Sequence, residues 1–316
     1  MGKFMKGCAI TALILIVLGA VMAVTAGALK GTAEIGQVVE SVTGGRIHFN
    51  PYGWGVFIND NDWDGFYHIE DNTIFDAAYD ILRGNVEKSV AGDNINSLDI
   101  EVGGCQFEFQ PSGDSNFYVE AKNTGKFQCY EKGNTLYIKS TRSINRWQDW
   151  KNCEIILYVP EDYFYDKVEI ELGAGLLVIG DLMADKADLT VGAGQITVEY
   201  LQADTCSIEV GMGEADVNDM QINEADVEVG MGRLYMYGSI LKELNAECSM
   251  GSIEMDLEGS EEDFNYGLEA AMGNVTIGHN DYSGIAIEKN KKNHTHHAQK
   301  DMDIECAMGD NEVSFN

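Results

Sequence analysis

Residues 168–204 read VEIELGAGLLVIGDLMADKADLTVGAGQITVEYLQAD and contain two strand-like segments, each followed by a Gly-Ala-Gly triplet. The triplet recurs twice as Gly-Met-Gly and three more times with Ser or Ala in its first place. The final glycines of the seven copies are Gly175, Gly194, Gly213, Gly232, Gly251, Gly273 and Gly309. Successive copies are 19, 19, 19, 19, 22 and 36 residues apart, and four equal steps indicate a repeat protein with a unit of about 19 residues.

Alignment on the final glycine separates two kinds of position. The residues three and five before the glycine and four after it are apolar in every copy. The position four before it holds Glu in six of the seven copies, in the order Glu171, Thr190, Glu209, Glu228, Glu247, Glu269 and Glu305. Alternation of apolar and polar residues is typical of a half-buried strand. Each repeat is therefore predicted to be a strand, a glycine corner, a second strand and a return.

A unit of this size cannot bury its own apolar face, so it must stack on its neighbours at the strand spacing of about 4.8 Å. We therefore predict an all-β fold, a single-stranded β-solenoid (β-helix-like) over residues 96–316, with the coils stacked in sequence order. Glycine suits the corners because it tolerates positive φ and allows close approach of successive coils. The 36-residue step contains EKNKKNHTHHAQK, which we expect to form a loop outside the stack.

The repeats, with the opening LDIEVGGCQFEF (98–109) and the segment CEIILYVP (153–160), resemble the bacterial putative-adhesin family of β-strand repeat domains labelled DUF4097. The resemblance covers about residues 96–316. It implies a β-repeat domain of the cell envelope that commonly follows a membrane anchor, and it carries no set of catalytic residues. The later corners depart from the family pattern, because Met replaces Ala and Ser249, Ala271 and Ala307 replace the first Gly.

The N-terminal segment decides the predicted location. Residues 8–29 are 22 residues without a charge, which as a helix would span about 33 Å, enough to cross a bilayer. Lys3 and Lys6 precede this run and favour a cytoplasmic N-terminus of residues 1–7. We expect a single-pass protein of the cell membrane with residues 30–316 extracytoplasmic. A cleaved signal peptide ending near Ala26-Gly27-Ala28 remains the alternative.

Residues 30–95 show no sustained period and are interpreted as an irregular extracytoplasmic spacer. The stretch from Asn50 to Asn72 places aromatic residues among Gly, Asn and Asp. These aromatics could equally lie at the headgroup level of a membrane or stack on glycan faces.

Composition excludes several classes of protein. The chain has 21 Lys and Arg against 52 Asp and Glu, a formal net charge of −31, so a nucleic-acid partner is not expected. No GxSxG, HExxH, P-loop or paired CxxC motif occurs in the sequence, and we predict that the protein is not an enzyme and uses no cofactor.

Three sets of residues are candidates for binding sites. His294, His296 and His297, with His279 as a further candidate neighbour, are interpreted as part of a solvated loop, and no metal site is predicted there. The corner methionines are interpreted as filling the corner of the core: Met212, Met231, Met250, Met272 and Met308. The glutamate column is interpreted as a solvated acidic face, with a ladder for a divalent cation as the alternative.

Six cysteines follow the predicted anchor, an even number that invites disulfides in an oxidising compartment. Sequence order would place the coil of Ala270 between those of Cys248 and Cys306, about 9.6 Å apart and too far for a bridge. With Cys206 in a different inward column, these cysteines are expected to be buried and reduced. The pairing of Cys105, Cys129 and Cys153 stays open.

The function expected from these features is that of a membrane-anchored, adhesin-like binding or structural module, which presents an acidic repeat surface to a cell-envelope or surface partner. Its other expected partner is the lipid bilayer, through the N-terminal helix. The alternative is an accessory or regulatory protein of an envelope-stress or sensing system that acts through lateral contacts of the anchor.

The topology can be tested in membranes. The intact protein should stay in the membrane fraction after carbonate washing, because a 22-residue apolar helix is not released by pH or salt. Protease added outside the cell should degrade residues 30–316. Recovery of a soluble chain that begins near Leu29 would contradict the uncleaved anchor.

Overall fold

The computed structural model describes residues 47–49, 56–58, 75–141, 153–283, 287–291 and 298–316. The chain divides into two units, residues 1–67 and 68–316. In the first unit β1 (Ile47–Phe49) and β2 (Val56–Ile58) form an antiparallel pair. Among the described residues no helix is both long enough and apolar enough to cross a membrane. The predicted anchor, residues 8–29, lies outside the described part of the chain.

The second unit contains a 16-stranded sheet and confirms the predicted all-β class for the described residues. Its strands are β3 (Leu82–Val90), β4 (Ser97–Pro111), β5 (Phe117–Lys132), β6 (Thr135–Thr141), β7 (Glu154–Val159), β8 (Phe164–Val191), β9 (Gln195–Val210), β10 (Glu214–Val229), β11 (Arg233–Cys248), β12 (Ser252–Leu257), β13 (Phe264–Ala270), β14 (Asn274–Ile277), β15 (Asn280–Ser283), β16 (Ile287–Lys291), β17 (Lys300–Cys306) and β18 (Asp310–Phe315). Two 3-10 turns, Gly92–Asn94 and Glu261–Asp263, interrupt them.

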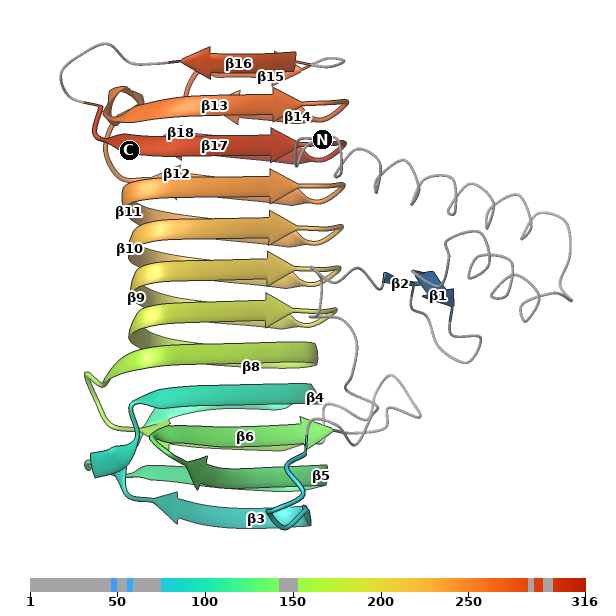
Figure 1. Ribbon diagram of the computed structural model, residues 1–316, viewed down its shortest axis with the longest axis vertical. Helices are drawn as coiled ribbons and strands as arrows, with labels where there is room; N and C mark the ends of the chain where they lie inside the picture. Colours follow the sequence, from blue (N-terminus) through green and yellow to red (C-terminus); the bar gives the residue numbers. More distant parts are fainter. Residues whose placement is uncertain (1–46, 50–55, 59–74, 142–152, 284–286, 292–297) are drawn as a thin grey trace, which may run out of the picture. The chain divides into compact units, whose positions relative to one another are not determined.

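Strands β8 to β12 wind as successive parallel coils with the predicted offset of 19 residues (Figure 1). Glu214 pairs with Arg233, for example, and Leu176 pairs with Gln195. The apolar columns of the repeat lie inside this stack, since Val191, Val210 and Val229 are at most 2% exposed. Stacking of the same apolar position on every coil makes one continuous core along the stack.

The predicted order of the coils is wrong at the C-terminal end. Strand β17 pairs with β11 on one side and with β13 on the other, and β18 lies between β12 and β14 in the same way. The last segment of the chain therefore forms a layer inside the stack, and the segment made earlier, β13 and β14, lies beyond it. The long step before β17 contains β15 and β16, which pair antiparallel with β14 and β13 and cover the outer edges of those strands.

This order overturns the separation expected for two cysteines. Cys248 and Cys306 are Cα partners in adjacent strands, and Ala270 pairs with Cys306 from the other side. All six described cysteines are buried and lie outside disulfides, and the burial of Cys206, Cys248 and Cys306 is as expected. Cys206 has Ala187 and Ala225 as its strand neighbours, as its column predicts.

The other end of the stack is closed by strands of mixed direction. β4 pairs with β8 in parallel, and on its opposite edge it pairs with β6 and then β7. β5 runs antiparallel to β3, β6 and β7. The change to antiparallel pairing ends the series of parallel coils, so the repeat does not continue beyond this end of the stack.

Glycine is required at the corners by contact between coils. A Cβ at Gly213 would lie 2.3 Å from the carbonyl oxygen of Gly194, and one at Gly232 would lie 2.3 Å from that of Gly213. Among the final corner glycines, only Gly175 has a positive φ, 114°. Close approach of the coils, and not backbone handedness, is therefore the reason for glycine at the remaining corners.

Substitution at a corner should be far more harmful than substitution at an open glycine. Gly213→Ala should destabilise the protein by about 1–3 kcal/mol, because the new methyl group overlaps a backbone carbonyl. Gly180→Ala is the matched control, since its Cβ would meet nothing within 4 Å. Urea unfolding of the two variants measures the difference, and equal midpoints would contradict the contact argument.

Candidate functional site

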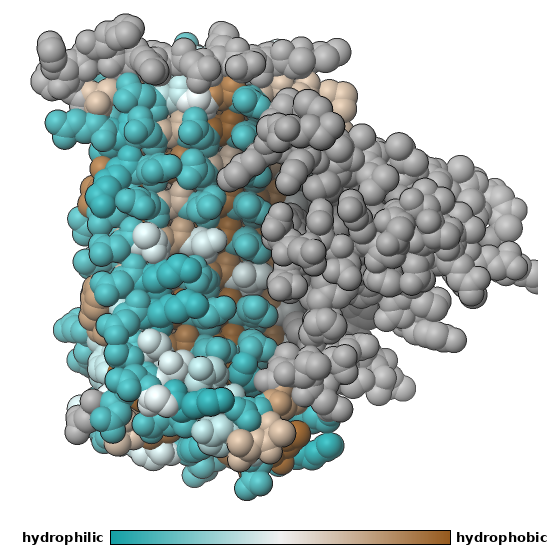
Figure 2. All heavy atoms as spheres, viewed as in Figure 1, coloured by the Kyte–Doolittle hydropathy of each residue, from teal (hydrophilic) through white to brown (hydrophobic). Residues whose placement is uncertain are grey.

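The candidate site is the face formed by the strand segments that precede the corners, called here the acidic face. It comprises the outward residues of β17, β13 and the C-terminal parts of β8 to β11, together with the first halves of β4 and β8. Figure 2 shows that hydrophilic side chains cover most of the described part of this side of the stack. Outward alternation of the strands places these side chains on one surface.

A row of glutamates crosses this face at one position of the coil. Strand register places five of them on consecutive strands, in the order Glu209, Glu228, Glu247, Glu305 and Glu269. We call this row the glutamate ladder. Its members are half-buried or exposed, which confirms the predicted outward direction. Because the inserted strand β17 supplies Glu305 at the same position, the ladder is continuous through the point where sequence order is broken.

The neighbouring column on the same face is also acidic. It carries Glu169, Asp188, Asp226 and Asp303 in register with Asp99, Ser207, Asn245 and Gly267. Beside the glutamate ladder the face therefore holds a second, interrupted column of carboxylates, two residues away along each strand.

Lysines neutralise the end of the face near β4. Lys139 of β6 is Cα partner of Glu101 and forms ion pairs with Glu101 and with Asp99, the latter at 3.4 Å. Lys167 pairs with Glu169 at 2.5 Å, and Lys186 pairs with Asp188 at 2.8 Å. Lys139 is only 7% exposed, so its buried charge is balanced by these two carboxylates.

Burial and mutual repulsion raise the pKa values of several acids on this face. Burial, aided by the charges of Glu101 and Glu169, raises the pKa of Glu171 to about 7. Burial also raises the pKa of Asp99, against the opposing effect of Lys139. In the ladder itself, burial raises the pKa of Glu209, with further contributions from Asp188 and Asp226. The raised pKa values mean that these carboxylates are more stable when they bind a proton or another cation than when they carry an unbalanced negative charge.

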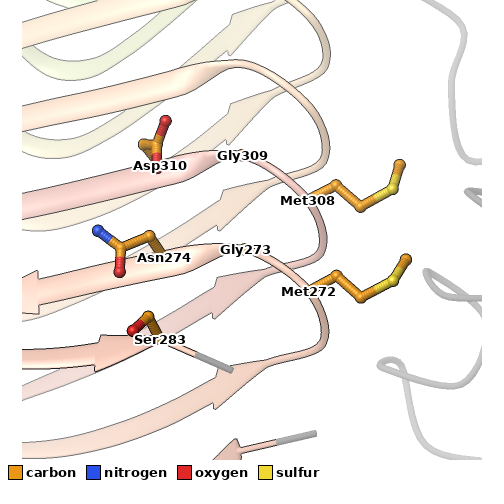
Figure 3. A pocket seen from close by; sticks show the side chains of 7 residues that line it. All are labelled: Met272, Gly273, Asn274, Ser283, Met308, Gly309 and Asp310. Carbon is orange, nitrogen blue, oxygen red and sulfur yellow. The ribbon is translucent and has the colours of Figure 1, made fainter. Parts of the chain in front are cut away.

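The corner methionines are not part of the core, so that prediction is wrong. Met212, Met231 and Met272 are 47%, 49% and 61% exposed. Figure 3 shows Met308 and Met272 on adjacent corners, both directed away from the coil interior. The interior of each corner is already occupied by the residue three before its final glycine. Val191, three before Gly194, shows this, because its Cγ1 would lie 2.7 Å from a Cβ at Gly213 of the next coil.

Backbone hydrogen bonds place these methionines on successive corners, in the order Met212, Met231, Met250, Met308 and Met272. They form an apolar row along one edge of the acidic face. Beside the last two lies an open hollow that is also lined by Asn274, Ser283 and Asp310 (Figure 3).

Within the described residues no group of three His, Cys, Asp or Glu side chains is arranged to hold a metal ion. His279 is exposed, and His294, His296 and His297 lie outside the part of the chain that the structure describes. The sequence identified the glutamate ladder but missed Lys139, which lies in the segment TLYIKS before the repeats begin.

A family model described as Toastrack DUF4097 matches residues 95–277 and 179–314. The chain belongs to the Toastrack DUF4097 family. The resemblance seen in the sequence is thereby confirmed. A comparison with curated proteins finds no match.

A comparison with solved structures finds several that are similar to this Toastrack chain. A putative adhesin from Bacteroides fragilis is 15% identical, with a TM-score of 0.38 over 72% of this chain and 96% of that one. A putative adhesin from Parabacteroides merdae is 12% identical, with a TM-score of 0.39 over 74% and 96%. A putative lipid binding protein from Parabacteroides distasonis is 14% identical, with a TM-score of 0.34 over 73% and 97%.

The raised pKa of Glu171 predicts how the stability of the protein changes with pH. Its folded pKa of about 7 lies above the ordinary value of 4.5, so the folded protein binds this proton more tightly than the unfolded chain. Stability from this group is complete below about pH 4.5 and is lost as pH rises to about 7.

Glu171→Gln should therefore stabilise the protein by about 1–2 kcal/mol at pH 8, after allowance for solvent screening, and should change it little at pH 4. Thermal unfolding at both pH values measures the effect. An equal shift at pH 4 and pH 8 would show that the carboxyl is not held in its neutral form.

Proposed function

We propose that this protein is a membrane-anchored, adhesin-like Toastrack module without catalytic activity, whose solenoid-like repeat domain lies outside the cell and binds an envelope partner on the acidic face. Family membership supports the binding-module class. The observation that carries the proposal is the glutamate ladder, five carboxylates on five consecutive strands.

The ladder stores electrostatic repulsion. Carboxylates about 4.8 Å apart repel by about 3 kcal/mol per pair at an effective dielectric of 20, and by under about 1 kcal/mol in water. The half-buried members lie between these limits. A bound partner that brings positive charge relieves this repulsion, so the folded domain has a built-in preference for cationic groups.

The spacing of the ladder also limits the shape of the partner. Carboxylates repeated at the strand spacing favour an extended chain with regularly placed amines over a compact cationic protein. The row of exposed methionines beside the ladder adds apolar contact along the same direction. We infer that the partner is an extended amine-bearing polymer or peptide segment of the envelope.

Features of the N-terminal sequence support the proposed location. Residues 8–29 are long enough to span the bilayer, and Lys3 and Lys6 orient the short N-terminus toward the cytoplasm. In that arrangement the predicted spacer, residues 30–95, connects the anchor to the repeat domain. The acidic face then meets polymers and proteins of the envelope and not cytosolic ligands.

Charge removal from the ladder tests the proposal. The full chain, reconstituted in lipid nanodiscs, is incubated with isolated envelope polymers and envelope proteins, and retention is measured against salt concentration. The triple variant Glu209→Gln, Glu228→Gln and Glu247→Gln should bind about tenfold more weakly and should lose most of the salt dependence.

The matched control is Glu199→Gln, Glu254→Gln and Glu312→Gln, which removes the same charge from exposed positions on strands that follow the corners. It should bind as the unaltered protein does. Equal loss in both triple variants would assign the effect to net charge and would contradict a site on the acidic face. Capture of a membrane sensor protein alone, insensitive to either variant, would favour the regulatory alternative.

A further inference from the structure

Four of the six described cysteines face one another in two pairs. Cys248 and Cys306 are Cα partners in adjacent parallel strands, and their side chains share a hydrogen bond. The side chains of Cys105 and Cys153 also share a hydrogen bond, and the amide of Gln106 donates to the Cys153 carbonyl at 2.9 Å. Adjacent strands lie about 4.8 Å apart, within the Cα separation of about 4.4–6.8 Å that a disulfide spans.

Both pairs lie where the winding departs from sequence order. Cys248 and Cys306 join β11 to the inserted strand β17. Cys105 lies in β4 and Cys153 directly precedes β7. These two strands pair with each other although β5 and β6 lie between them in the sequence. The other two described cysteines lie elsewhere and face other residues: Cys206 has alanines on both sides, and Cys129 is opposite Ile138.

The positions of the pairs match a structural need. A coil that follows its predecessor in sequence is held by a short connection. An inserted strand, in contrast, is joined to its neighbour only through a long stretch of chain that contains other strands. The loops closed by the two pairs are 153 − 105 = 48 and 306 − 248 = 58 residues long. Cross-links that close long loops restrict the unfolded chain most strongly.

We propose that Cys105 with Cys153, and Cys248 with Cys306, are two disulfide-forming sites that lock the two non-sequential junctions of the stack. In each site two thiols lose two protons and two electrons and one Sγ–Sγ bond forms. The electron acceptor is a disulfide-bonded thiol oxidant, which is reduced to two thiols by exchange through a mixed disulfide. Use of the sites in the cell rests on the extracytoplasmic location proposed above, but the chemistry of the sites does not.

Burial determines when the bonds form. All four thiols are at most 3% exposed, so an oxidant cannot reach them in the closed stack. The shared hydrogen bonds and burial raise the pKa of the Cys248 and Cys105 thiols, whereas the hydrogen bond with Cys248 lowers the pKa of Cys306, so it is burial that protects the pairs in the folded protein. Exchange therefore takes place before β17 and β7 dock, or when a junction opens locally.

The space around the C-terminal pair supports sulfur at these positions. A Cβ at Gly273 would lie 2.3 Å from Cys306 Sγ, and a Cβ at Gly309 would lie 2.5 Å from Cys248 Sγ. The two thiols thus fill the space that the corner glycines of the next layers leave. Ala270 occupies the same column as Cys306, so Ala at position 306 fits the fold.

Oxidative refolding of the purified full chain in detergent tests the proposal. All proteins carry Cys8→Ser, which removes the remaining cysteine of the sequence. The chain is refolded with oxidised glutathione, free thiols are alkylated, and a non-reduced digest is analysed by mass spectrometry. We expect cross-links between Cys105 and Cys153 and between Cys248 and Cys306, with Cys129 and Cys206 alkylated.

Stability supplies the second readout. The Tm of the oxidised chain should exceed that of the reduced chain by roughly 10–20 °C. Cys306→Ala should lose about half of this difference, and the matched variant Cys206→Ala should retain all of it. Refolding to the native Tm with all six thiols free, or other cysteine pairings in the digest, would overturn the proposal. Because no partner or membrane location enters this experiment, its failure is distinguishable from failure of the ladder binding test.

Discussion

The whole stack depends on the contact between a corner glycine and the carbonyl of the corner beside it. A Cβ at Gly251 would lie 2.2 Å from the oxygen of Gly232, so any side chain would force the coils apart. With glycine, the corner amides donate across the gap, as Met231 does to Gly211 at 2.7 Å and Met250 does to Gly230 at 2.8 Å. These bonds hold the 19-residue register, and the register in turn keeps each apolar column buried and each acidic column aligned.

The repeat in the sequence was sufficient to predict the position of a residue within its coil. The columns of Val210 and Glu209 lie inward and outward as expected, because alternation along a strand depends only on neighbouring residues. The order of the coils was not predictable in the same way. A period states which residues are equivalent but not which coils touch, and the 22- and 36-residue steps leave enough chain for the last coil to return between two earlier ones.

Two errors concerning side chains have local causes. The corner methionines were assigned to the core because Ala174 and Ala193 hold the same place, but that place is the outer apex of a tight bend, where alternation does not apply. Lys139 is not marked by the repeat because β6 carries no glycine corner, and its place beside Glu101 follows from pairing between residues 38 apart in the sequence. The glutamate ladder was predictable, whereas the ion pairs of Lys139 with Asp99 and Glu101, at the β4 end of the acidic face, were not.

The inserted coil has a consequence for synthesis of the chain. During translation residues 264–291 emerge before residues 300–316, yet in the finished stack they lie farther from the centre. A nascent chain that wound strictly in sequence order would place β13 directly on β11, in the place that β17 occupies in the structure. The domain therefore cannot be completed layer by layer from the ribosome. It has to leave, or reopen, a slot one strand wide until the final residues are released, so a stop codon before β17 would not shorten the stack from its tip but would leave it without an internal layer.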